Sequence, residues 1–159
     1  LLGIVGIGTS GPVIALSTMP ILALIFWRNL GGALLMASFA LRNREWSKVE
    51  SRQGMRWAAL AGVALALHFI GFFIAMRFTT VAAGTALTAL QPIFAAYLVK
   101  RLGGHIPRQA WLGMIISLSG VLIITGVDFQ ISRRAFIGDL AAIACAALAA
   151  LYVMLGSHA

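Results

Sequence analysis

The chain has 159 residues, of which 61% are hydrophobic and only 10% are Asp, Glu, Lys or Arg. An average soluble domain is about 25% charged and about 45–50% apolar, so this chain has too few charged side chains to cover a surface exposed to water. The composition excludes an ordinary soluble domain and indicates that a lipid bilayer surrounds the chain.

The formal net charge is +8, which in a soluble protein would suggest nucleic acid as a partner. The basic residues lie instead in short connections between apolar runs, as in membrane proteins that face anionic headgroups. We therefore expect the lipid bilayer as a partner and no nucleic acid. A single cysteine, Cys145, rules out a disulfide within the chain and is expected to be a small packing residue. No His, Cys, Asp and Glu residues have metal-ligand spacing, so no metal and no cofactor is expected.

Six apolar runs reach or approach the roughly 20 residues that a helix needs to cross the hydrocarbon core. They cover residues 1–17, 20–41, 57–76, 79–99, 110–127 and 136–156. Strands of a membrane barrel would alternate over about ten residues, whereas these runs are continuously apolar. The predicted fold is all-α, a polytopic helical membrane protein with six transmembrane helices.

The orientation in the membrane follows from the connections. Residues 42–56 and 100–109 together hold eight of the twelve Lys and Arg residues. Basic residues in short loops are retained in the cytoplasm, so both connections and the amino terminus are predicted to be cytoplasmic.

Six sets of short strings occur in order along the chain. They are Phe26-Trp27-Arg28-Asn29-Leu30; His68-Phe69; Ala75-Met76-Arg77-Phe78-Thr79-Thr80; Leu90-Gln91-Pro92-Ile93-Phe94; Trp111-Leu112-Gly113 with Gly120-Val121; and Gly138-Asp139-Leu140 with Ala150-Leu151-Tyr152. In this order they resemble the EamA type of the drug/metabolite transporter superfamily.

The resemblance implies a ten-helix transporter made of two inverted five-helix repeats, in the bacterial inner membrane. Residues 1–127 would be the first repeat and 136–159 the first helix of the second. Because the chain also begins inside an apolar run at Leu1, we expect a fragment that needs the missing second half or a second copy. The resemblance further implies export of small metabolites, amino acids or drug-like compounds by alternating access, with a coupling proton or ion.

Arg28 is the first candidate site residue. It lies eight residues from the outer end of its span, about 12 Å deep at about 1.5 Å per residue. An arginine at that depth costs about 2.5–3.5 kcal/mol, which apolar neighbours can offset, so the charge has to face protein or water. It can bind a substrate carboxylate or act as a gate; the alternative is a side chain that snorkels to the interface.

Thr88, Gln91 and Pro92 form a second candidate group in the run 79–99. Pro92 has no N–H, so the Thr88 carbonyl loses its helical partner just where Gln91 adds an amide. The group predicts either a cavity at a broken helix or a kink whose polar groups bond a neighbouring helix.

His68 interrupts a ridge of small residues formed by Ala61, Ala64, Gly71 and Ala75. It is either a hydrogen-bonded packing residue or a lining residue of the cavity that can carry a proton. Asp139, near the outer surface, is a candidate charge partner of Arg28 or a proton-coupling acid. The alternative for Asp139 is an acid at a helix amino terminus, where the helix dipole favours it.

Two other classes of function compete with a transporter. A membrane scaffold or regulatory subunit would explain a chain of six spans. An intramembrane enzyme would need a nucleophile with a base, and Cys145 has no such neighbour in the sequence. The residues themselves do not identify the small-molecule substrate.

Overall fold

The computed structural model describes residues 11–42, 52–127 and 132–158, and this part of the chain is helical, without strands. After a helical segment at residues 11–16, the helices are α2 (Ile21–Arg42), α3 (Arg52–Phe78), α4 (Val81–Thr88), α5 (Gln91–Arg101), α6 (Arg108–Val127) and α7 (Arg133–Gly156). The predicted all-α fold is confirmed. The predicted first span, residues 1–17, lies mostly outside the described residues.

Four stretches are long and apolar enough to cross a membrane: Ile21–Phe39, Arg52–Phe78, Val81–Arg101 and Arg133–Gly156. α6 contributes a shorter apolar stretch, Arg108–Ile123. These stretches coincide with the five predicted spans after the first, although α3 and α7 both begin earlier than their apolar runs. The chain is therefore a helical membrane protein.

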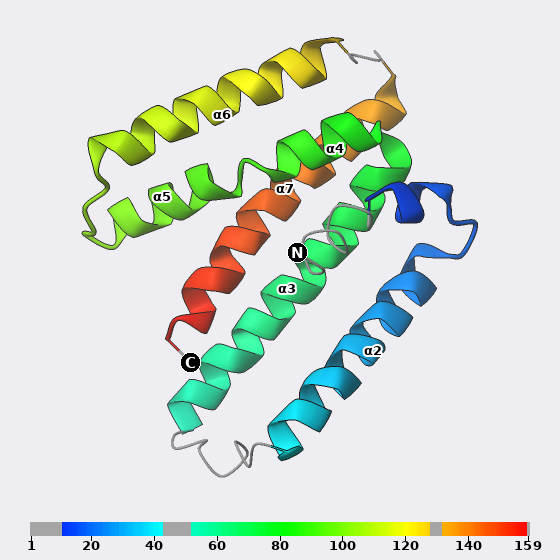
Figure 1. Ribbon diagram of the computed structural model, residues 1–159, viewed down its shortest axis with the longest axis vertical. Helices are drawn as coiled ribbons and strands as arrows, with labels where there is room; N and C mark the ends of the chain where they lie inside the picture. Colours follow the sequence, from blue (N-terminus) through cyan, green and yellow to red (C-terminus); the bar gives the residue numbers. More distant parts are fainter. Residues whose placement is uncertain (1–10, 43–51, 128–131, 159) are drawn as a thin grey trace.

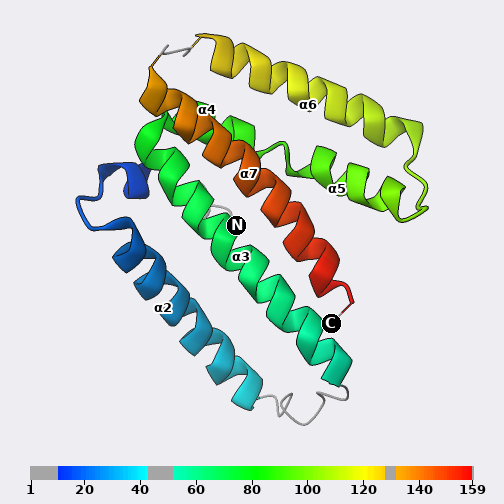
Figure 2. The ribbon, with the colours of Figure 1, turned by 180° about the vertical axis from the view of Figure 1, so that it is seen from behind.

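α3 and α7 run antiparallel at the centre of the structure (Figures 1 and 2). Their contact is lined by small residues, because a Cβ added to Gly71 of α3 would lie 3.2 Å from the carbonyl oxygen of Ala141. Ala61, Ala64 and Ala75 of the predicted ridge are all buried. In lipid, helices associate by close packing rather than by the hydrophobic effect, so this ridge is the principal contact between spans.

The fourth span is not one helix. α4 ends at Thr88 and α5 begins at Gln91, with Pro92 in the first turn of α5. Between them the chain makes a short turn, in which the N–H of Leu90 donates to the carbonyl of Leu87 at 3.1 Å. Because proline cannot donate to the carbonyl four residues earlier, the interruption predicted at Pro92 is present in the structure.

Arg77 ties together one end of the bundle. Its Nη2 donates to the carbonyl of Ser17 at 2.7 Å and also to that of Met19. Arg134 of α7 in turn donates to the carbonyl of Arg77 at 3.2 Å, and its guanidinium lies 5.0 Å from the centre of the Phe78 ring. The turn before α2, the end of α3 and the start of α7 are thereby connected.

α5 and α6 also run in opposite directions (Figure 1). The end of α7 returns to the beginning of α3, where the rings of Trp57 and His158 are 5.5 Å apart. That the two connections rich in basic residues lie on one side of the membrane stays a prediction from their charges.

α2 and α6 lie at the two edges of the bundle (Figures 1 and 2). Many of their large apolar side chains are exposed, with Leu22 of α2 and Ile116 of α6 both 71% accessible. In water such apolar faces would promote aggregation, whereas in a membrane they are the surfaces that contact lipid.

Gly138 is the closest approach of α7 to the turn between α3 and α4, since a Cβ there would lie 2.7 Å from the backbone nitrogen of Thr79. We predict that Gly138→Ala destabilises the protein by about 1–3 kcal/mol, the usual cost of overpacking. Thermal unfolding of the detergent-purified protein measures this effect. Gly31→Ala is the control, because its Cβ meets nothing within 4 Å; equal unfolding temperatures for the two variants would contradict the packing.

Candidate functional site

A cluster of polar side chains lies where α3, α4 and α7 meet. The Nδ1 atom of His68 lies 2.9 Å from the carbonyl oxygen of Cys145 and 3.0 Å from its Sγ. The Thr88 side chain lies beside the same thiol. Two of the predicted site residues, His68 and Thr88, are thus brought together by Cys145, which the sequence had suggested only as packing.

The hydrogens in this cluster follow from what each group can do. A carbonyl only accepts, so Nδ1 of His68 carries the hydrogen and donates it to Cys145, which leaves Nε2 as the basic nitrogen. The Thr88 hydroxyl donates to the carbonyl of Gly84, in its own helix, at 2.8 Å. The His68–Cys145 hydrogen bond joins α3 to α7, and Thr88 of α4 lies beside it.

The proximity of His68 and Cys145 resembles the pairing of a base with a nucleophile, but the chemistry is different. Nδ1, the nitrogen near Sγ, already holds a hydrogen and cannot remove one from the thiol. Cys145 is also fully buried. The contact therefore acts as a connection between α3 and α7, not as a catalytic pair.

Arg28 lies on the other side of α3, in a groove between α2 and α3. Its guanidinium carbon is 4.3 Å from the centre of the Phe69 ring, a cation–π contact. The groove has a volume of about 580 Å³, and Asn29, Gly32, Met36 and Leu65 are among the residues that line it. Arg28 thus faces a cavity large enough for a small molecule.

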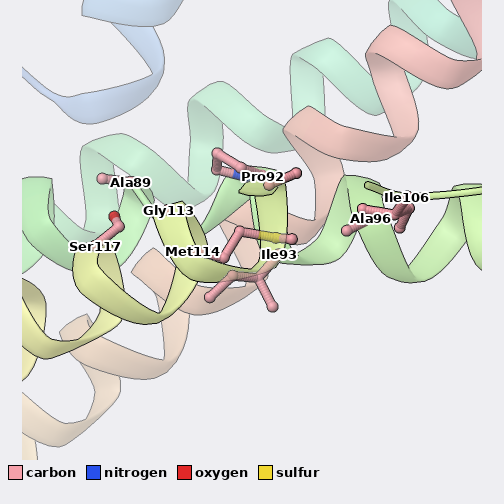
Figure 3. Close-up of a pocket in the computed structure, with 9 residues that line it drawn as sticks. Ala89, Pro92, Ile93, Ala96, Ile106, Gly113, Met114 and Ser117 are labelled. Carbon is pink, nitrogen blue, oxygen red and sulfur yellow. The ribbon is translucent and has the colours of Figure 1, made fainter. Parts of the chain in front are cut away.

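Pro92 lines a separate cavity of about 350 Å³ between the α4–α5 interruption and α6. Figure 3 shows Ala89, Pro92 and Ile93 on one wall and Met114 and Ser117 of α6 on the other. Ser117 is its polar residue, and the rest of the lining is apolar or glycine. Gln91, the first residue of α5, is half-buried beside the interruption and is not among the residues lining this cavity.

Asp139 lies in the second turn of α7, because the helix begins at Arg133 and has no acidic residue in its first turn. One of its oxygens, Oδ1, is buried and accepts no hydrogen bond in the described part of the chain. Arg28 is stacked on Phe69 instead. The described contacts thus do not include the predicted pairing of Asp139 with Arg28, and the helix dipole acts too weakly in a second turn to account for the acid.

The predicted site residues therefore occupy different places around α3. Arg28 lies on the α2 side, and His68 and Thr88 lie on the α7 side. Pro92 lines a cavity on the α6 side. Their grouping into one substrate cavity stays a prediction. Within the described residues, no three His, Cys, Asp or Glu side chains are placed to hold a metal ion.

Comparison with protein families decides the class of the protein. The model of the EamA-like transporter family matches residues 1–126, which include α2 to α5 and nearly all of α6. The chain belongs to the EamA-like transporter family. No curated protein and no solved structure shows significant similarity to it.

Membership in the EamA-like family makes this chain an integral, multi-pass membrane protein of a transporter family. The family match ends within α6, so α7 lies outside it. The contact between His68 and Cys145 consequently joins a residue of the matched EamA-like region to one beyond it.

Cys145 is the sole cysteine of this EamA-like chain, so its reactivity reports on the α3–α7 contact alone. We predict slow reaction with N-ethylmaleimide in the folded protein and a rate about 3- to 20-fold higher in His68→Ala, because an interhelical hydrogen bond is worth about 0.6–1.7 kcal/mol. Mass spectrometry of the modified protein measures the rate. His105→Cys in a Cys145→Ser background, at an exposed position in the connection before α6, should react fast, because its thiol is in water; wild-type Cys145 reacting equally fast would disprove its burial.

Proposed function

We propose that the protein is a secondary transporter that exports small metabolites, amino acids or drug-like compounds by alternating access. The observation that carries this proposal is the interrupted α4–α5 span, whose last α4 residue, Thr88, lies beside Cys145 of the His68–Cys145 contact. Interrupted helices place backbone and side-chain polar groups at membrane depth, where transporters bind their substrates. Membership in a transporter family supports the same class of function.

The interruption also gives the span two short helices that can tilt separately. α4 packs against α3, α6 and α7, and α5 packs against α7. A movement of α5 relative to α4 would change access to the cavity at Pro92 and the surroundings of Thr88 together. Substrate binding can drive such a movement only by favouring one of the two arrangements.

A coupling proton or ion is part of the proposal. With Nδ1 of His68 committed to the Cys145 carbonyl, a proton can be taken up at Nε2 without breaking that hydrogen bond. His68 is thus suited to hold a proton while α3 and α7 stay joined. The second set of helices that alternating access requires would come from a further part of the protein or from a second copy.

We predict that Pro92→Ala, which restores a donor for the Thr88 carbonyl, slows transport by about tenfold or more by joining α4 to α5. The measurement is efflux from proteoliposomes that contain the full-length protein and are loaded with radiolabelled amino acids or ethidium. Pro107→Ala, in the exposed connection before α6, is the control and should transport normally. Protein-dependent efflux absent for every solute tested, with or without a pH gradient, would reject a transporter.

The proposed location is the bacterial inner membrane, with the amino terminus and both basic connections in the cytoplasm. We predict that a membrane-impermeant thiol reagent labels Thr18→Cys in intact cells and labels His105→Cys only after permeabilisation, both in a Cys145→Ser background. Both positions are exposed in the structure, so accessibility reports the side of the membrane. The reverse labelling pattern would invert the orientation.

A further inference from the structure

The groove between α2 and α3 carries a positive charge at one end and apolar walls along its length. We propose that it binds an amphipathic anion, with the acidic group at Arg28 and the apolar part along the groove. The inference rests on the proposed function, which it deepens by naming the class of substrate.

The end of the groove that would bind the ligand's acidic group is defined by how Arg28 is held. Phe69 covers one face of the guanidinium at 4.3 Å, which orients the planar group and leaves its N–H edges for a ligand. A guanidinium edge binds a carboxylate or a phosphate through two parallel hydrogen bonds. Asn29, which also lines the groove, adds an amide donor beside it.

The charge balance of the groove selects an anion. None of its described lining residues is Asp or Glu, so Arg28 has no acidic partner there. Arg28 lies seven residues into α2, about 10 Å along the helix from Ile21 at about 1.5 Å per residue. An unpaired cation at such a depth is costly, and a ligand anion lowers that cost, whereas a ligand cation would raise it.

The apolar end is defined by the walls beyond Arg28. Leu35 and Met36 of α2 face Leu65 and Ala66 of α3 across the groove. Met36 lies eight residues beyond Arg28, so the apolar stretch is about 12 Å long. The volume of about 580 Å³ suits a small amphipathic molecule rather than a single ion.

Two glycines keep the groove open. Gly32 of α2 and Gly62 of α3 both line it, and a Cβ added to either would meet nothing within 4 Å. The space beside Gly32 is therefore free for a ligand tail and can be filled by a large side chain. This gives a variant that shortens the groove without changing its charge.

The same chemistry can come from two sources. One is a free carboxylate with an apolar tail, which would be a transported solute. The other is an anionic phospholipid whose headgroup reaches Arg28 and whose acyl chain follows the groove. Both have an acidic head and an apolar tail, and they differ in whether the bound molecule belongs to the bilayer.

The test uses the full-length protein in phosphatidylcholine nanodiscs, with radiolabelled octanoate as the probe and empty nanodiscs as the background. We expect saturable octanoate binding, with neutral octanamide and cationic octylamine competing at least about tenfold more weakly, since a charge-assisted bidentate contact is lost. Arg28→Gln should weaken octanoate binding by a similar factor. Arg28→Lys, which keeps the charge and loses the planar edge, should be intermediate.

Gly32→Leu tests the contribution of the ligand's apolar tail independently of its acidic group. It should weaken octanoate binding. Acetate, added as a second competitor, has no apolar tail and is expected to compete weakly and equally in the wild type and in Gly32→Leu, because it does not reach beyond Arg28. Arg101→Gln is the matched control, since Arg101 also stacks on an aromatic ring, that of Tyr97 at 5.1 Å, but lies on α5. Its octanoate affinity should equal that of the wild type.

Nanodiscs containing phosphatidylglycerol distinguish the two sources. Octanoate binding that is unaffected by phosphatidylglycerol assigns the groove to a free solute. Displacement of octanoate, with phosphatidylglycerol retained by the wild type and lost from Arg28→Gln in native mass spectrometry, assigns it to a lipid.

The inference is overturned if octanamide binds as tightly as octanoate, or if Arg28→Gln and Gly32→Leu both leave binding unchanged. Binding is measured without a gradient and does not depend on transport. Normal octanoate binding with no efflux of any solute rejects the proposed function alone. Efflux that depends on Pro92, with no octanoate binding that depends on Arg28, rejects this inference alone.

Discussion

The close contact between α3 and α7 supports most of the described structure. In a bilayer, two apolar helices gain nothing from leaving lipid for each other, so association depends on dense packing and on hydrogen bonds. Gly71 and Gly138 permit the approach, and the His68–Cys145 hydrogen bond adds a polar link within it. α4 and α5 pack on α7, and α2 packs on α3, so each depends on this pair for its position.

α3 also makes two different polar contacts, one with α7 and one with α2. His68 and Phe69 are consecutive, and their rings are 5.3 Å apart, yet His68 bonds α7 while Phe69 supports Arg28 of α2. A rotation of α3 about its own axis would alter both contacts at once. The groove beside α2 and the polar cluster beside α7 are thus linked through one helix, although they lie on different sides of it.

The sequence predicted what depends on a single helix. Helical spacing identified the ridge that includes Gly71, and the missing N–H of Pro92 identified the interruption. Contacts between helices escaped prediction, because the meeting of His68 with Cys145 depends on how two helices are rotated and aligned. Asp139 was placed one turn too close to the helix start, because Ser132, whose Oγ accepts from the N–H of Ala135 at 3.0 Å, caps α7 before its apolar run begins.

The divided fourth span has a consequence for how the chain enters the membrane during synthesis. Val81–Arg101 has a mean hydropathy of 1.4, against 2.2 for α3 and 2.1 for α7. Its two short helices leave backbone groups without helical partners, which weakens partitioning into lipid further. α3 leaves the ribosome before this span and α7 after it. Because α4 and α5 pack on α7, we expect the fourth span to reach its final placement only after α7 has entered the membrane.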